Sequence, residues 1–167
     1  MTTTANNAPA TNLTQETLPI FIQAIMHYFN HITAVPAETE TPYLEEGGSD
    51  VSDVTAIIGV SGDLQGCVYY TAPKEMLDQL LGFVAEDEPT DTLRCDMAGE
   101  VANTLSGNAR KHLGPGFMIS VPVVIQGKPE RLVHYKGNSC FVIPIRWRGM
   151  RSFLKICLIE TPMSFEF

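Results

Sequence analysis

The sequence lacks several features that would place it in whole classes of proteins. No uninterrupted apolar stretch reaches the ~18 residues of a membrane-spanning helix, and no basic segment followed by an apolar run marks a signal peptide. Basic residues are scarce, with 11 Lys and Arg against 19 Asp and Glu and a net charge of −8. This average field would repel nucleic acid and anionic lipid. We therefore expect a cytoplasmic protein with neither nucleic acid nor membrane as a partner.

Cysteine is also sparse. The four cysteines are Cys67, Cys95, Cys140 and Cys157. They form no CxxC motif and have no histidine at ligand spacing. All but Cys95 lie in apolar, strand-like runs, where a reduced cysteine behaves as a small hydrophobic residue. His27 and His31 share a helix face, but a metal site needs three or four ligands and no third is evident. We expect no metal and no cofactor of the chain's own.

The length and the mixed composition suit one globular domain. The segment 1–12 has no periodicity, so we predict a disordered N-terminal tail followed by a single domain over residues 13–167. An amphipathic helix comes first, with Pro19 in its first turn and Asn12, Thr14 or Thr17 as its cap. Its apolar face consists of Leu18, Phe21, Ile22, Ile25, Phe29 and Ile32.

Most of the later apolar segments have the composition of strands. Residues 54–60 and 64–71 predict a hairpin with its turn at Ser61-Gly62-Asp63. A short helix follows Pro73 and should bury Leu77, Leu80, Leu81 and Val84. Further strands are predicted over residues 41–45, 117–125, 131–135, 140–147 and 152–160. We predict an α+β fold in which three helices cover one face of a meandering antiparallel sheet with a mixed edge.

One long helix is predicted over residues 91–113, capped by Thr90, Asp91 or Thr92 and stopped by Gly114-Pro115-Gly116. Its apolar sector comprises Met97, Ala98, Val101, Ala102, Leu105 and Ala109. At ~100° per residue, a polar stripe lies opposite this sector. The stripe comprises Asp96, Glu100, Asn103 and Gly107.

A polar stripe can simply be the solvent-exposed side of an amphipathic helix. Here Asn103, Gly99 and Gly107 interrupt the helix although Asn is a poor helix former and Gly costs ~1 kcal/mol relative to Ala. Such residues indicate an approaching partner, and Gly107 would let its surface come close. The stripe is therefore the predicted working site.

The segment from Asp96 to Ala109 resembles the signature helix of the CheX branch of the CheC/CheX/FliM superfamily. The family pattern is Asp or Ser, three residues, Glu, two residues and Asn, which Asp96, Glu100 and Asn103 match. Residues 54–70 resemble the first hairpin of the family, and residues 121–127 resemble its following strand and turn, including a proline. A single Glu-x-x-Asn copy favours CheX over CheC-like members, which carry two.

The resemblance implies a phosphatase of the phosphorylated CheY-like response regulator. Glu100 would match the acidic residue that pairs with the active-site lysine of the regulator, and Asn103 the amide that orients the attacking water. Asp96, Gly99 and Gly107 would contact the partner. For Asp96, a positioning contact and a plain surface charge both remain open. Mg²⁺ and the phosphoaspartate would belong to the partner, so this chain needs no nucleophile of its own.

Two other functions remain open at this stage. A non-catalytic adaptor of a two-component or chemotaxis pathway would use the same helix face, whereas a structural component akin to the flagellar switch is disfavoured by the intact Glu100 and Asn103. The resemblance also implies a homodimer joined through the sheets. The apolar strand 153–159 would be the edge that pairs with the second copy.

Overall fold

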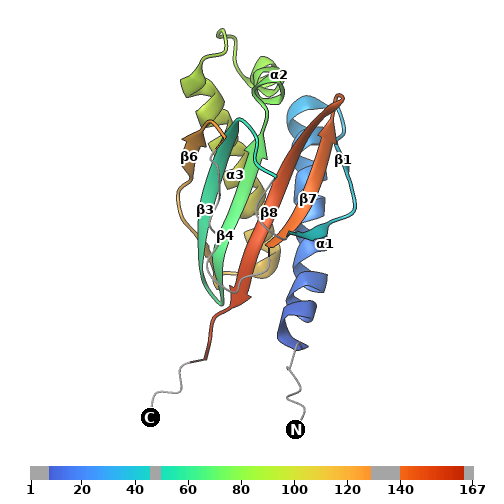
Figure 1. Ribbon diagram of the computed structural model, residues 1–167, viewed down its shortest axis with the longest axis vertical. Coiled ribbons are helices and arrows are strands. Elements are labelled where there is room, and N and C mark those ends of the chain that lie inside the picture. The colour runs from blue at the N-terminus through green and yellow to red at the C-terminus, as the bar shows by residue number, and fades with distance from the viewer. Residues whose placement is uncertain (1–7, 46–49, 129–139, 164–167) are drawn as a thin grey trace.

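The computed structural model describes residues 8–45, 50–128 and 140–163. The predicted strand over residues 131–135 lies outside these ranges. The chain order is α1 (Ala8–Thr33), β1 (Glu38–Thr39), β2 (Tyr43–Glu45), β3 (Val54–Gly62), β4 (Leu64–Ala72), α2 (Lys74–Val84), α3 (Asp91–Leu113), β5 (Phe117–Ile119), β6 (Val123–Gln126), β7 (Cys140–Trp147) and β8 (Met150–Glu160). The helices lie on one side of the sheet (Figure 1), which confirms the predicted α+β fold.

The strands form one antiparallel sheet in the order β1-β7-β8-β4-β3-β5, with β2 also on β7 and β6 also on β3. Two hairpins, β3–β4 and β7–β8, make its centre, and they join through the β4–β8 pairing. Because β4 is next to β8, which is far along the chain, the sheet is not the predicted meander of sequential strands.

The main core lies between the sheet and the helices. Its largest fully buried side chains include Trp147, Tyr70, Phe21, Phe29, Phe117 and Leu105. A smaller apolar cluster lies on the other face of the sheet, which we call the second face, and contains Tyr69, Cys140 and Cys157 with Ile57 and Cys67 packed against them. In α2 the predicted Leu77, Leu80 and Leu81 are buried, but Val84 is exposed.

The start of α1 differs from the sequence prediction. The helix already runs from Ala8, and Pro19 lies inside the helix rather than in its first turn. A proline there removes one backbone hydrogen bond. The segment after it buries Phe21, Ile25 and Phe29 in the core, and most helical stability comes from such packing rather than from local propensity.

The predicted strand 117–125 is divided into β5 and β6. Ile119 is opposite Val60 and Val123 is opposite Ile57, so three residues of one strand face two of β3. The extra residue makes a β-bulge. Ser120 bridges it by accepting a hydrogen bond at Oγ from the Gly59 amide, at 2.9 Å. The bulge allows Pro122, which has no amide hydrogen, to sit at the sheet edge without a lost ladder bond.

Strand β8 is not the edge strand that the sequence predicted. Residues 153–159 pair with β4 on one side and, through residue 156, with β7 on the other. Its backbone groups are therefore used within the chain, and the dimer contact predicted along this segment is wrong. Among the described strands, the outer ones are β1 and β2 on one side and β5 and β6 on the other, and an edge-to-edge homodimer would pair there.

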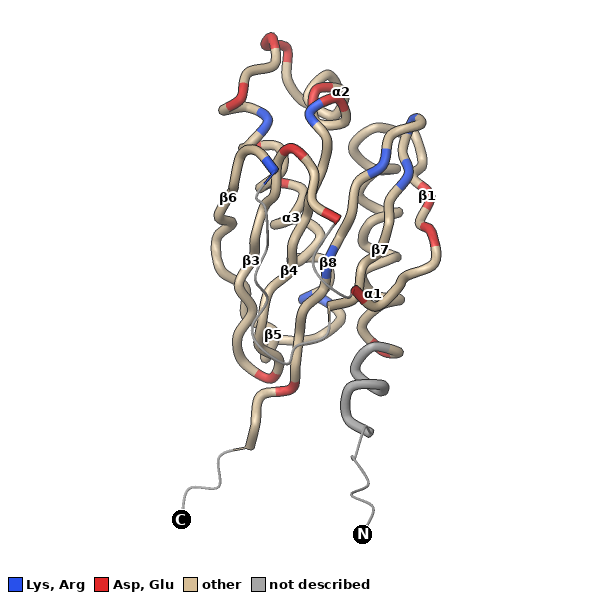
Figure 2. The backbone as a smooth tube through the Cα atoms, in the orientation of Figure 1, with Lys and Arg blue, Asp and Glu red and all other residues tan. Residues whose placement is uncertain are grey.

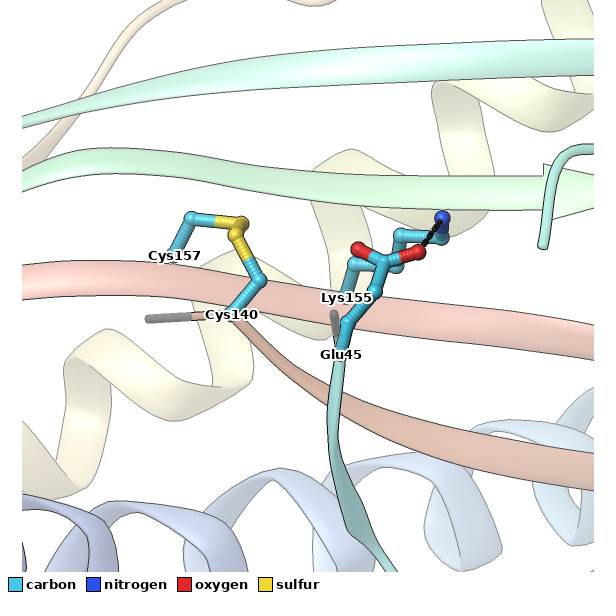
Figure 3. Close-up of a disulfide and its surroundings, with 4 residues drawn as sticks. All are labelled: Glu45, Cys140, Lys155 and Cys157. Atoms are coloured by element: carbon cyan, nitrogen blue, oxygen red, sulfur yellow. Dashed lines mark hydrogen bonds and ion pairs between the residues drawn. A yellow bond between two sulfur atoms is a disulfide. The ribbon is translucent and has the colours of Figure 1, made fainter. Parts of the chain in front are cut away.

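The prediction of reduced cysteines is wrong for two of them. Cys140 and Cys157 form a disulfide between β7 and β8, with their Cα atoms 4.3 Å apart (Figure 3). The β7–β8 register explains the bond because it brings the two residues face to face. Cys67 and Cys95 are free thiols.

Candidate functional site

Helix α3 begins and ends at the predicted residues because both of its ends have capping interactions. At the first turn the Thr90 hydroxyl accepts a hydrogen bond from the Leu93 amide at 3.2 Å, which satisfies one of the unpaired amides of a helix start. At the other end Gly114 has φ 90° and donates its amide to the Arg110 carbonyl. A side chain would be disfavoured at this φ, so glycine ends the helix there.

The α3 side chains divide into two faces as the helical period predicts. The predicted apolar sector is buried, with Val101, Leu105 and Ala109 fully enclosed. On the opposite side Asp96, Glu100 and Asn103 are exposed and Gly107 is half-buried. A Cβ built on Gly107 would have no neighbour within 4 Å. The structure therefore brings Glu100 and Asn103 together, one turn apart, on an accessible stripe.

Ion pairs fix the first turns of α3 against α2. The Arg94 guanidinium binds Asp78 of α2, with Nε 2.5 Å from Oδ1, and also binds Asp91 at 3.0 Å. Acidic residues are concentrated nearby in the loop that joins α2 to α3 (Figure 2). These contacts anchor α3 at the end away from its C-cap, so the stripe belongs to a rigid element, as a positioning site requires.

Glu100 has two neighbours that sequence reasoning missed. The Thr104 hydroxyl donates a hydrogen bond to Glu100 Oε1 at 3.3 Å. Tyr28 of α1 is buried, and burial, with smaller contributions from Tyr70 and the Glu100 carboxylate, raises the pKa of its phenol. The phenol therefore stays neutral. Thr104 could have been found from its i+4 spacing to Glu100, whereas no local signal connects α1 to this residue.

The surroundings of Gly99 differ from the predicted contact with a partner. It is buried, and a Cβ there would lie 3.4 Å from both Pro122 Cγ and Val124 Cγ2. This side of α3 is covered by the β5–β6 segment of the same chain and is not open to a partner. The predicted partner contact at Gly99 is therefore wrong, because its absent side chain serves the close packing of α3 on the bulged edge.

The stripe offers a carboxylate and a carboxamide but no activated nucleophile. Among the described residues no group of three His, Cys, Asp or Glu could hold a metal ion. In the same ranges no helix is long and apolar enough to span a membrane. An exposed amide on a rigid helix can orient a water molecule, and a neighbouring carboxylate can pair with a cation. Both actions require a second molecule that brings the reacting group.

Comparisons with known proteins give one family match and several similar structures. The family described as chemotaxis phosphatase CheX matches residues 54–146, more than half of the chain. No curated protein sequence matches the chain. Among solved structures, a protein from Desulfovibrio vulgaris Hildenborough assigned to chemotaxis is similar, with 27% identity and a TM-score of 0.76 over 86% of this chain and 97% of the other.

Two further structures share the fold. The chemotaxis protein CheX from Vibrio vulnificus has 22% identity and a TM-score of 0.76, covering 86% of this chain and 99% of that one. CheX from Borrelia burgdorferi, solved in complex with CheY, BeF3 and Mg²⁺, has 20% identity and a TM-score of 0.71, covering 86% and 98%. The similarity to these structures covers 86% of this chain, which is more than residues 54–146 of the family match.

Proposed function

The chain belongs to the CheX family of chemotaxis phosphatases, and from this premise we propose that it hydrolyses the aspartyl phosphate of a CheY-like receiver domain. The observation that carries the proposal is the pair of exposed side chains, Glu100 and Asn103, one turn apart on the rigid helix α3. The complex of the Borrelia relative with CheY and Mg²⁺ supports a receiver as the partner and a metal held there.

The two residues have unequal roles in this proposal. Asn103 enters the receiver's site and holds the attacking water in line with the phosphorus, using its amide as donor and acceptor. Glu100 pairs with a lysine of the receiver, and the hydrogen bond from Thr104 limits the orientations of its carboxylate. Phosphoryl transfer depends mainly on positioning and electrostatic stabilisation, so a helix without a nucleophile is sufficient. Asp96 and Gly107 border the pair and would contact the receiver's surface.

The direct test mixes the full chain with a phosphorylated receiver and follows phosphate release. The chain should accelerate release at substoichiometric concentration, because each molecule would dissociate and act again. A non-catalytic adaptor would bind the same face without turnover. Release that stops after one equivalent, or binding without any acceleration, would refute the proposed enzyme and support the adaptor.

Replacing Glu100 with alanine should weaken docking more than chemistry. A lost charge-assisted contact corresponds to about 1 to 3 kcal/mol, so the dissociation constant for the BeF3-loaded receiver should rise by about 5- to 150-fold. Glu88→Ala removes the same charge in the exposed α2–α3 loop and is the matched control. Isothermal titration calorimetry measures the dissociation constant of each variant. If Glu100→Ala and Glu88→Ala bind the receiver with equal affinity, Glu100 has no docking role.

Replacing Gly107 with alanine should separate stability from docking. Because a Cβ there has open space, the change should raise the free energy of unfolding by about 0.5 to 1 kcal/mol through helix propensity. It should also weaken receiver binding if the partner surface comes close at this point. Gly82→Ala in α2 is the control, since its Cβ also has no neighbour within 4 Å. Urea unfolding and binding titration should show that both variants are stabilised and that only Gly107→Ala loses affinity.

A further inference from the structure

Three of the four cysteines lie in a row across neighbouring strands. Cys157 of β8 is bonded to Cys140 at the start of β7, on one side. On its other side Cys157 is directly opposite Cys67 of β4 in the β4–β8 register. All three belong to the apolar cluster on the second face of the sheet. The middle cysteine therefore has a possible disulfide partner on each side.

We propose that this row is a thiol–disulfide exchange site in which Cys157 is bonded alternately to Cys140 and to Cys67. The Cys67 thiolate attacks Cys157 Sγ, the new sulfur–sulfur bond forms as the bond to Cys140 breaks, and Cys140 leaves as a thiolate. The proton lost by Cys67 is balanced by the one that Cys140 takes up. No net oxidation occurs, so no external oxidant or reductant is needed.

The strand geometry favours this step. Attack of a thiolate on a disulfide requires access to one of its sulfurs, and a row across strands places the attacking and leaving cysteines on opposite sides of the central one. Directly opposed residues of antiparallel strands have Cα atoms about 4.5 to 5.5 Å apart, which overlaps the range of disulfides. A bond between Cys67 and Cys157 would therefore need little backbone movement.

The surroundings of Cys67 also suit an attacking thiol. Cys67 is half-buried, so the attacking group is not sealed inside the core. Burial raises the pKa of the Tyr69 phenol. The charge of Cys67 and a hydrogen bond to its sulfur raise this pKa further, so the phenol keeps its proton beside the sulfur. Two residues before Cys157, the buried ammonium of Lys155 is part of the same face.

The exchange would change which strands are crosslinked. With the Cys140–Cys157 disulfide in place, β7 is crosslinked to β8. Strand β2 pairs with the start of β7, where Glu45 is opposite Cys140. In the other state the bond would tie β8 to β4 and leave Cys140 as a thiol beside β2. The thiol available for modification would then move from the sheet centre to the start of β7.

Disulfide mapping of the full chain tests this proposal. The oxidised protein is held at mildly alkaline pH, quenched with acid, unfolded, alkylated with N-ethylmaleimide and digested without reduction. Both linkages, Cys140–Cys157 and Cys67–Cys157, should appear, with the label shared between Cys67 and Cys140 and present on Cys95 throughout. The proportion should not depend on protein concentration, since the step is intramolecular. A single linkage with no label on Cys140 would overturn the proposal.

Two variants complete the test. Cys67→Ser should abolish the Cys140 label, because the attacking thiol is gone, whereas Cys95→Ser should leave the distribution unchanged. Cys140→Ser should form the Cys67–Cys157 disulfide when treated with oxidised glutathione, with the loss of two hydrogens visible in the intact mass. If Cys140→Ser is folded by circular dichroism yet keeps both thiols, the row does not exchange.

Discussion

Asn103→Ala should lose phosphatase activity while becoming slightly more stable. Asn103 is exposed on α3, and alanine is the better helix former, so the free energy of unfolding should rise by about 0.5 kcal/mol. Turnover of the phosphorylated receiver should nevertheless fall by about 10²-fold, because the water would no longer be held in line with the phosphorus. Single-turnover phosphate release at saturating variant measures this loss directly.

Comparing the change in kcat with the change in binding affinity identifies the role of Asn103. A group that acts only in the transition state lowers kcat and leaves ground-state binding unchanged, so affinity for the BeF3-loaded receiver should stay within about twofold. Asn108→Ala makes the same substitution on the same helix at a half-buried position away from the stripe, and it should keep parental turnover. If Asn103→Ala and Asn108→Ala release phosphate equally fast, Asn103 does not position the water.

The part of the site that lies within one helix could be predicted from the sequence. Helix α3 has the predicted bounds because Thr90 and Gly114 specify its ends, and the 3.6-residue period separates Leu105 from Glu100. The surroundings of the pair could not be predicted, because α1, which carries Tyr28, packs on α3 only in the folded chain. Such contacts between distant segments leave no local pattern.

Errors in the fold arose where local rules competed with distant pairing. Pro19 locally indicates a helix start, but it lies inside α1, and the buried Phe21, Ile25 and Phe29 of this helix come after it. The apolar run 117–125 has the pattern of one strand, and only its register on β3 reveals the bulge. The Cys140–Cys157 pair was predictable in principle, since a turn that places Trp147 opposite Met150 also aligns the two cysteines. The row with Cys67 was not, because it requires the β4–β8 pairing.

Glu45→Ala should cause a large loss of stability. The Lys155 ammonium is 2.6 Å from Glu45 Oε1, and the two side chains are only 0% and 3% exposed (Figure 3). Removing the carboxylate leaves a buried cation without this partner, which typically costs about 3 to 5 kcal/mol. That is a large fraction of the ~5 to 15 kcal/mol that stabilises an ordinary domain. Urea unfolding under constant redox conditions measures the change.

An exposed ion pair provides the comparison that assigns this cost to burial. Glu40 pairs with Arg146 at 3.2 Å and with Arg151, but its side chain is 32% exposed and those of the arginines 64% and 51%. Water already solvates these charges, so Glu40→Ala should cost about 0 to 1 kcal/mol. Equal losses for Glu40→Ala and Glu45→Ala would show that desolvation does not dominate at Lys155.

Replacing both members of the buried pair separates the cost of an unpaired charge from the value of the pair. In Glu45→Leu combined with Lys155→Met, no charge remains to be desolvated and the apolar side chains can pack against Tyr69 and Val142, which face Lys155 in the register. The double variant should recover most of the stability lost in Glu45→Ala, because paired burial roughly balances desolvation against attraction. If it is as unstable as Glu45→Ala, the ion pair itself contributes the missing free energy. The pair would then stabilise the second face of the sheet directly, beyond avoiding a buried unpaired charge.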